Sequence, residues 1–372
     1  MTADGDYDLV IVGASFAGLT AARAAALRGL DVLVLEAKRD PGARIHTTGI
    51  LVKEAAEERD VPDSLVRPVS MVRLYSPSLE HVDLATRGYY FLTTDMPGLM
   101  RWLAAEAERA GARIRCSAKV TEARRAGERI ELPEHGVSAR FLLGADGARS
   151  TVARIFGLGR NRRLLIGMEQ EFSHVEGLDE RFLHCFLDSR LAPGYIGWVA
   201  PAPQVVQVGL ATDDRHRPDI AAFRRHLSPL FTFDEERIVE RRSGVIPCGG
   251  IVRPFARDNV MLVGDAAGMV SPLTAGGIQM AFRFGRRAGQ LIADHLKRGG
   301  ELPQEVLARE LPALMHKRAM RWLLERRPPN RIYDFLIGSW PMRRLAAGTF
   351  FHDRALPPSP LPRNAEGDRE RR

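Results

Sequence analysis

The sequence has few cysteines and no long hydrophobic segment. Its 372 residues include three cysteines, Cys116, Cys185 and Cys248, which lie far apart and form no Cys-x-x-Cys pair. Such an odd, scattered set predicts no disulfide framework and no metal site, and we expect small buried hydrophobic side chains instead. No apolar run reaches the roughly eighteen residues of a membrane-spanning helix. Acidic residues precede the first apolar run, the reverse of a signal peptide, which favours a cytoplasmic location.

The composition is otherwise that of a globular protein of about two or three domains, with 45% hydrophobic and 27% charged residues. The net charge is +8, and no nucleic-acid motif accompanies it, so we expect no nucleic-acid partner. Arginines gather late in the chain, interleaved with aromatic and aliphatic residues. This mixture suits a peripheral contact with an anionic membrane and equally a helical cap over the core. The arginines concerned are Arg318, Arg321, Arg326, Arg327, Arg331, Arg343 and Arg344.

The first 36 residues have the pattern of a βαβ unit. An apolar, β-branched run at 7–12 predicts a buried parallel strand, residues 17–28 predict a helix, and 32–35 predict a second buried strand that ends at Glu36.

The remaining chain shows two patterns of predicted elements, one before residue 164 and one after it. Before residue 164 we expect helices at 51–59 and 98–110, an exposed hairpin of strands 69–75 and 81–86, further strands within 113–132, and a buried strand at 141–145. From 164 to 247 the strands alternate, with one helix at 220–227. The buried-strand pattern returns at 260–263, before a long helix at 277–297. The alternating strands are those at 167–173, 182–187, 195–199 and 205–211.

The first motif, Gly13-Ala14-Ser15-Phe16-Ala17-Gly18, joins the first strand to the first helix. Gly13 permits a tight turn, Gly18 lets the helix and the strand pack closely, and the free N–H groups at the helix start attract a pyrophosphate. Glu36, followed by Ala37, is placed to accept hydrogen bonds from adenosine ribose hydroxyls. Ser15 replaces the usual middle glycine, but the order of strand, turn, helix, strand and acid predicts a dinucleotide site.

Two later motifs favour FAD over NAD. Asp146 and Gly147 follow a buried strand, and Gly264-Asp265 follows another, just before a Pro- and Gly-rich loop. An aspartate at that strand end can bind a polyhydroxylated ribityl chain. The helix that starts at Gly276-Gly277-Ile278 can direct N–H groups at the flavin, which stabilises the negative charge of the reduced ring. Val120 is a further candidate contact, and Arg44 either binds the FAD phosphates or forms a surface salt bridge.

Together these motifs resemble those of the p-hydroxybenzoate-hydroxylase-like flavoproteins, and most closely the geranylgeranyl reductase family. The resemblance covers most of residues 7–300 and includes the segments 243–250, 264–268 and 271–278. Residues 193–201 are similar to that family's aromatic Trp-x-Phe-Pro substrate segment, although Ile196 and Ala200 depart from it. The active-site cysteine of archaeal members is absent, and residues 46–49 stand in its place.

The strand and helix patterns predict a Rossmann-like FAD-binding domain with an inserted, mainly antiparallel β-sheet substrate domain and a helical C-terminal region, followed by a tail rich in Pro and then in charge. The FAD-binding domain then comprises residues 1–66, 93–160 and 249–300. The substrate domain comprises a hairpin at 67–92 and residues 161–248, the helical region is 301–355, and 356–372 is a disordered tail.

The resemblance implies reduction of C=C bonds in an isoprenoid or other hydrophobic substrate by reduced FAD. NAD(P)H or a reduced electron-transfer protein would supply the electrons. Trp198 and Phe172 are candidate substrate contacts, and Tyr195 or His46 is a candidate proton donor. Core packing for Trp198 and a loop hydrogen bond for His46 are the plainer interpretations. Two alternatives stay open: an FAD-dependent monooxygenase of the same fold, and a non-enzymatic prenyl-binding escort. A halogenase is less favoured because no Trp-x-Trp-x-Ile-Pro segment is present.

Overall fold

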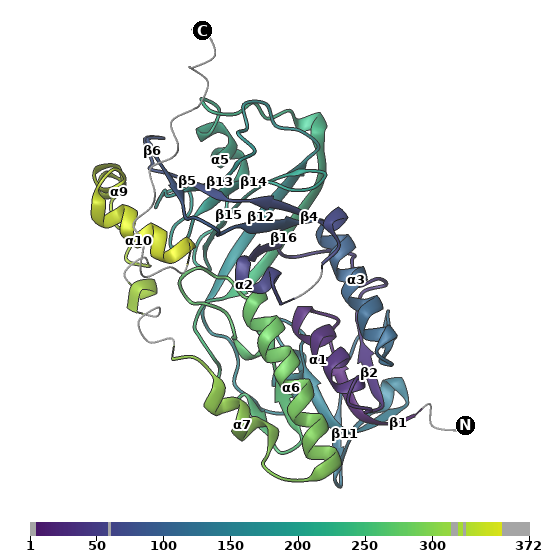
Figure 1. Ribbon diagram of the computed structural model, residues 1–372. Coiled ribbons are helices and arrows are strands. Elements are labelled where there is room, and N and C mark those ends of the chain that lie inside the picture. The colour runs from purple at the N-terminus through teal and green to yellow at the C-terminus, as the bar shows by residue number, and fades with distance from the viewer. Residues whose placement is uncertain (1–4, 59–60, 314–318, 323–324, 352–372) are drawn as a thin grey trace.

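The computed structural model describes residues 5–58, 61–313, 319–322 and 325–351 (Figure 1). Its largest sheet has the strand order β17-β18-β11-β1-β2-β8, and the strands from β18 to β8 are parallel. The central strands are buried on both faces, as their continuous apolar runs predict. The strands are β1 (Asp6–Val12), β2 (Val32–Leu35), β8 (Arg113–Arg115), β11 (Val137–Gly144), β17 (Ala256–Arg257) and β18 (Val260–Leu262), with β9 (Arg124–Ala126) and β10 (Arg129–Leu132) paired beside β11.

Two helices in close contact, α1 (Phe16–Ala26) and α6 (Ile278–Arg298), run side by side along this sheet, with α3 (Met96–Arg109) on the other side of α1 (Figure 1). Gly285 permits the contact, because a Cβ there would lie 2.5 Å from the carbonyl oxygen of Ala17. The N-terminus of α6 lies seven residues before this contact, and α1 begins one residue before Ala17. At a rise of about 1.5 Å per residue, α6 therefore begins roughly 10 Å beyond the start of α1.

The second large sheet has seven strands in the order β16-β12-β15-β14-β13-β5-β6. Every neighbouring pair is antiparallel except β13–β5, so the expectation of a mainly antiparallel sheet beside a Rossmann-like one is confirmed. The helix α5 (Ile220–His226) packs on one face, against an apolar cluster. The strands are β5 (Met71–Tyr75), β6 (His81–Ala85), β12 (Leu164–Phe172), β13 (Phe182–Phe186), β14 (Gly197–Pro201), β15 (Val206–Asp213) and β16 (Ile238–Pro247).

A three-stranded sheet, β3-β7-β4, was not foreseen. It comprises β3 (Ile50–Val52), β4 (Val66–Val69) and β7 (Phe91–Thr94), and β3 occupies the start of the helix expected at 51–59, which is shortened to α2 (Lys53–Ala56). The hairpin β5–β6 exists, but it is not exposed. Val72, Leu74, Val82 and Leu84 are all buried, because β5 pairs with β13 within the second large sheet.

The C-terminal region is helical where it is described, with α7 (Pro303–Glu310), α9 (Asn330–Leu336) and α10 (Trp340–Phe350) at one side of the molecule (Figure 1). Ile337 and Phe351 are buried against the second large sheet, which is the cap that the sequence allowed. Arg321 is buried too, whereas Arg318 and the tail 356–372 lie outside the described residues. The remaining short helix is α4 (Thr151–Ile155).

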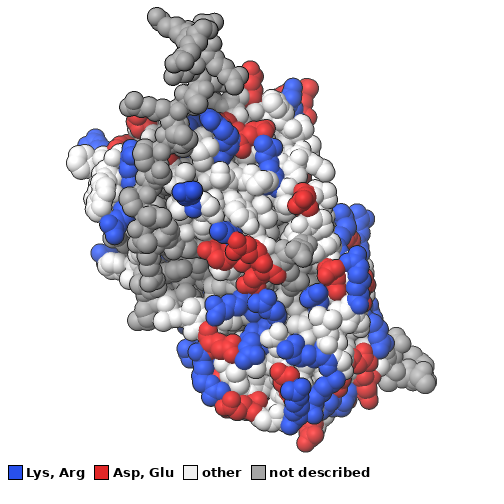
Figure 2. Space-filling model, viewed as in Figure 1, with Lys and Arg blue, Asp and Glu red and all other residues white. Residues whose placement is uncertain are grey.

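The structure shows where the charged side chains and the three cysteines lie. Figure 2 shows Lys and Arg concentrated at the end that carries α6 and α7, with Asp and Glu among them. All three cysteines are free, and Cys185 and Cys248 are buried as expected, whereas Cys116 is only partly buried. Across the described ranges, no helix combines the length and the apolar composition that a membrane span needs.

Candidate cofactor and substrate site

A cavity of about 1310 Å³ extends between the two large sheets. Ordinary small-molecule pockets occupy roughly 300–1,000 Å³, so this cavity has room for more than one small ligand. One end is formed by the carboxyl edge of the parallel sheet and the starts of α1 and α6. The other end is formed by the second large sheet and the helices α9 and α10. A cavity at the carboxyl ends of parallel strands is the usual ligand position in such folds.

The loop between β1 and α1 forms the first wall, and residues 13–17 all line the cavity. The Ser15 hydroxyl caps α1 by accepting a hydrogen bond from the Gly18 N–H at 3.2 Å. Gly18 itself lies behind the lining residues. The Glu36 carboxylate accepts hydrogen bonds from the Ala14 N–H at 2.7 Å and from the Lys38 N–H at 2.8 Å. Each carboxylate oxygen can accept a second hydrogen bond, so Glu36 can fix the loop and still receive a ribose hydroxyl.

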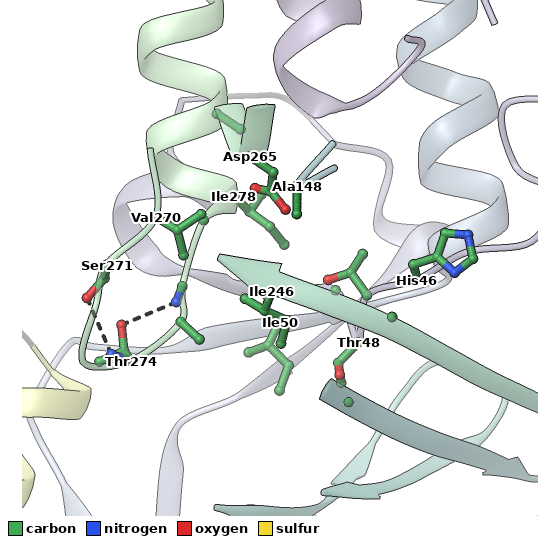
Figure 3. Close-up of a pocket in the computed structure, with 18 of the residues that line it drawn as sticks. His46, Thr48, Ile50, Ala148, Ile246, Asp265, Val270, Ser271, Thr274 and Ile278 are labelled. Atoms are coloured by element: carbon green, nitrogen blue, oxygen red, sulfur yellow. Dashed lines mark hydrogen bonds between the residues drawn. The ribbon is translucent and has the colours of Figure 1, made fainter. Parts of the chain in front are cut away.

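The start of α6 forms the second wall. No side chain caps this helix, and Gly276, Gly277 and Ile278 line the cavity, with the N–H groups of Gly277 and Ile278 available to a ligand. The loop before it is held by two hydrogen bonds, from the Thr274 N–H to the Ser271 hydroxyl and from the Gly276 N–H to the Thr274 hydroxyl (Figure 3).

Asp265 lies beside the start of α6, with a Cβ on Gly277 placed only 3.3 Å from its Oδ1. Its side chain points into the space that Ile278 and Ala148 border (Figure 3). Among the described residues none donates a hydrogen bond to this carboxylate. Burial raises the pKa of Asp265 to about 6. A cavity-facing acceptor without a protein partner fits a ligand that brings hydroxyl groups.

The other predicted cofactor contacts divide into two groups. Ala37, Val120, Asp146 and Gly147 line the cavity. The Asp146 Oδ2 accepts hydrogen bonds from the N–H groups of the first turn of α4, and its Oδ1 is buried without a partner. The structure does not bring Arg44 to the cavity: it is exposed and absent from the lining residues.

These features fit FAD. Two helix starts offset by roughly 10 Å along the helix direction, with acids beside each, match a ligand that has a pyrophosphate and a flavin ring at a distance along one molecule. Where the chain is described, no group of His, Cys, Asp and Glu side chains could hold a metal ion.

The opposite end of the cavity is apolar. Tyr195 and Trp198 lie between this apolar end and the loop before α6, and the Tyr195 hydroxyl donates a short hydrogen bond, 2.5 Å, to the carbonyl oxygen of Thr274 in that loop. Burial raises the pKa of Tyr195 above its usual value. The apolar lining includes Leu74, Phe91, Leu183, Cys185, Leu187, Ile196, Ala200, Met342, Leu345, Ala346 and Phe350.

Two of the predicted residues lie differently from expectation. His46 lines the cavity but is exposed; its Nδ1 lies 2.8 Å from the carbonyl oxygen of Ser243, and its ring points away from Asp265 (Figure 3). The structure does not bring Phe172 to the cavity at all. Phe172 pairs with Val206 and is fully buried on the face of the second sheet that packs against α5. Val206, Val208 and Leu210 of β15 belong to the same apolar cluster beside α5, whereas Trp198 and Ala200 of β14 line the cavity from the other face.

A buried polar cluster on the second large sheet was missed by sequence reasoning. It comprises Glu169, Glu171, Gln207 and Arg242, all buried. Arg242 lines the cavity, and the other three lie behind the cavity-lining Trp198 and Thr48. Arg242 forms ion pairs with Glu171 and Glu240 at 2.8 Å each. The signal that could have revealed it is a pair of glutamates on one face of the strand β12, whose remaining residues, apart from Gln170, are apolar or glycine.

Comparison with known proteins agrees with this geometry. Residues 6–307 match a family profile described as an FAD binding domain. Over 326 residues the chain is 30% identical to the digeranylgeranylglycerophospholipid reductase of Methanothrix thermoacetophila, which covers 82% of each protein.

Solved structures resemble the fold as well. A geranylgeranyl bacteriochlorophyll reductase-like protein from Thermoplasma acidophilum superposes with a TM-score of 0.78 at 21% identity, over 89% of this chain and 90% of that one. A probable FAD-dependent monooxygenase from Pseudomonas aeruginosa gives a TM-score of 0.66 at 18% identity, over 89% of this chain and 99% of that one.

Proposed function

The chain belongs to the FAD binding domain family and, within it, to the geranylgeranyl reductases, and on that premise we propose that it reduces C=C bonds of an isoprenoid or another hydrophobic substrate. It is an FAD-dependent oxidoreductase. Bound and reduced, FAD supplies a hydride to one carbon of the double bond. The protein binds the substrate, orients it and keeps water away from the reacting atoms.

The observation that carries this proposal is the apolar extension of the cavity. Beyond Trp198 the lining consists of aliphatic and aromatic side chains from β5, β13 and β14 on one side and from α10 on the other. Few polar groups face this space, so it favours a ligand that buries hydrocarbon; each buried CH₂ group contributes about 0.8 kcal/mol. Leu345 lines the cavity and is also 49% exposed, which places the apolar end close to the surface.

For the cofactor we propose contacts with the residues that line the cavity at the two helix starts. Residues 13–17 and Glu36 would bind the pyrophosphate and the adenosine ribose, and Asp265 with the start of α6 would bind the ribityl chain and the flavin ring. Tyr195 and Trp198 would contact the substrate. The electron donor would be NAD(P)H bound transiently beside the flavin, or a reduced electron-transfer protein.

Anaerobic single turnover tests the reaction type. The FAD-loaded protein is reduced by dithionite without oxygen and mixed with a geranylgeranyl lipid, and the product is analysed by mass spectrometry. A gain of two mass units per double bond supports reduction. Product that forms only after oxygen is admitted, with a gain of sixteen mass units, would instead establish the monooxygenase. A protein that binds the lipid but holds no FAD would establish the prenyl-binding escort.

We also propose that α9 and α10 contact a membrane of anionic lipids. Phe335 is 85% exposed and Trp340 is 64% exposed. The Arg344 guanidinium lies 5.3 Å from the centre of the Trp340 ring. Basic and aromatic side chains on one exposed surface are typical of peripheral membrane proteins. Vesicles with phosphatidylglycerol should retain the protein at low salt and lose the Phe335→Ser, Trp340→Ser double variant, whereas equal retention of the two would contradict the contact.

A further inference from the structure

Glu169 is a carboxylic acid enclosed beside the reactive part of the cavity. It is 6% exposed, on β12, and does not itself line the cavity. Its Oε2 accepts two hydrogen bonds, from the Thr48 hydroxyl at 2.7 Å and from the Trp198 indole N–H at 3.0 Å. Both of these partners line the cavity. Glu169 is therefore one hydrogen bond away from the substrate space in two directions.

Strand register produces this arrangement. Trp198, Gly209, Glu169 and Arg242 are consecutive partners across β14, β15, β12 and β16, so they share one face of the sheet. Gly209 makes the contact possible, since a Cβ there would lie 2.5 Å from the Trp198 ring. The indole can therefore lie across β15 and reach a carboxylate two strands away.

The surroundings of Glu169 balance its two protonation states. On the same strand Glu171 disfavours ionisation, and on β16 Arg242 favours it. The Glu169 Oε1 and the Arg242 Nη1 form a buried ion pair at 3.8 Å, beyond hydrogen-bond distance, and neither atom has a hydrogen-bond partner among the described residues. From β14 and from the loop 46–49 the contacts are the uncharged Trp198 and Thr48. Burial outweighs the rest and raises the pKa of Glu169 to about 7.

We propose that Glu169 is the proton reservoir of the site and that Thr48 conducts its proton to the substrate. This inference rests on the proposed C=C reduction, which adds a hydride to one carbon and a proton to the other. When Glu169 is protonated, its O–H donates to the Thr48 oxygen and the Thr48 O–H turns to the substrate. The electron pair of the double bond then takes the proton of the Thr48 O–H, and the Thr48 oxygen takes the proton of Glu169. A C–H bond forms, the Glu169 O–H bond breaks, and Thr48 is unchanged. The resulting carboxylate keeps the Trp198 N–H and gains the attraction of Arg242, and solvent later returns a proton.

The test uses the FAD-loaded protein and two independent readouts. Infrared difference spectra recorded during a pH titration detect the C=O band of a protonated carboxylic acid, without any need for turnover. Anaerobic single-turnover rates from pH 5 to pH 9 detect the need for that acid. Glu169→Gln keeps the shape and an acceptor oxygen for Trp198 and Thr48, but it has no acid proton. Glu171→Gln, on the same strand and face, is the matched control.

We expect an acid band that disappears with a midpoint near pH 7 in the wild type and is absent in Glu169→Gln. Glu171→Gln should keep this band but with a lower midpoint, because the like charge that disfavours ionisation of Glu169 is gone. The wild-type rate should fall above that midpoint. Glu169→Gln should be slower by about 10²–10⁴-fold, the usual range for a lost general acid, and its pH dependence should be flat there. Thr48→Ser should keep the rate and Thr48→Val should lose it.

Three results would overturn the inference: a midpoint near the ordinary value of 4.5, a band unaffected by Glu169→Gln, or Glu169→Gln and Thr48→Val rates that equal the wild-type rate. A wild-type protein that reduces no alkene would refute the proposed function instead. The infrared titration would then still decide whether Glu169 holds a proton at neutral pH.

Discussion

The two large sheets hold their acidic side chains in different ways. At the edge of the parallel sheet, Glu36 and Asp146 accept hydrogen bonds from backbone N–H groups close to them in the fold, and Asp265 stands beside the start of a helix. In the second sheet, Glu169 and Glu171 are held by side chains from other strands and from a loop far away in the sequence. The first arrangement depends on local turns, and the second depends on strand register. Changes in backbone shape should therefore damage the first region, and changes in side-chain packing the second.

Gly13→Ala should have the largest effect, because it distorts the backbone turn between β1 and α1 at the edge of the parallel sheet. Gly13 has a φ of 104°, and a Cβ there would lie 2.5 Å from the carbonyl oxygen of Ala145. A strained φ and overpacking together cost about 2–5 kcal/mol of unfolding free energy, and FAD binding should be lost. Urea unfolding and FAD titration measure these two effects.

Gly88→Ala is the matched control for that prediction. Gly88 also has a positive φ, 72°, but its Cβ would meet nothing within 4 Å. It should cost only the backbone strain, about 1–2 kcal/mol. Equal losses of unfolding free energy for the two variants would show that the contact with Ala145 is unimportant.

The second largest effect should be a loss of unfolding free energy with rising pH, and it should come from Glu169 in the second sheet. Glu169 has a folded pKa of about 7 against an ordinary 4.5, so the folded state binds the proton more tightly than the unfolded state. The stability that the proton provides is complete below pH 4.5 and is lost as the pH rises through 7, by on the order of 3 kcal/mol. Glu169→Gln should lack this loss, whereas Asp265 gives both proteins a smaller loss of the same sign, complete near pH 6.

Urea unfolding at pH 5 and pH 8 of the FAD-free proteins checks this prediction. The wild type should lose more stability than Glu169→Gln between these two values. Parallel losses in the two proteins would mean that Glu169 does not exchange a proton in the folded state between pH 5 and pH 8, which contradicts a folded pKa near 7.

Gly209→Ala should have an intermediate effect on packing in the second region. Its Cβ would displace the Trp198 ring and separate the indole from Glu169, at a cost of about 1–3 kcal/mol. The Trp198 fluorescence should change while the FAD affinity stays the same. Gly167→Ala is the control, because the nearest atom to a Cβ there is 3.9 Å away. A similar loss of unfolding free energy for both variants would contradict the claim that the small size of Gly209 makes room for the Trp198 ring.

Phe172→Leu should have the smallest effect. Phe172 is fully buried on the α5 face of the second sheet, away from the cavity. A change between large apolar side chains should cost less than about 1.5 kcal/mol, and KM for the substrate should not change. A raised KM together with unchanged stability would instead indicate that Phe172 contacts the substrate.

The contrast between local turns in the first region and strand register in the second explains which elements the sequence predicts and which it does not. The strand expected at 32–35 is found as β2 (Val32–Leu35), and the helix expected at 277–297 is found as α6, because apolar runs and glycine turns are local signals. The strand β4 was missed because Pro68 counts against a strand, and β16 because charged residues interrupt its apolar pattern. The contact between Glu169 and Trp198 could not be foreseen, since it requires the register of three strands and the small size of Gly209.

Binding of FAD at the starts of α1 and α6 is the central claim, and titration of the FAD-free protein with FAD tests it most directly. Asp265→Ala removes the carboxylate beside α6, and Asp294→Ala, on the exposed side of the same helix, is the control. The wild type and Asp294→Ala should bind one FAD per chain, and Asp265→Ala should bind it at least about tenfold more weakly, as expected for a lost hydrogen bond to a charged group. A wild-type protein that takes up no FAD, or equal affinities in all three proteins, would contradict the account.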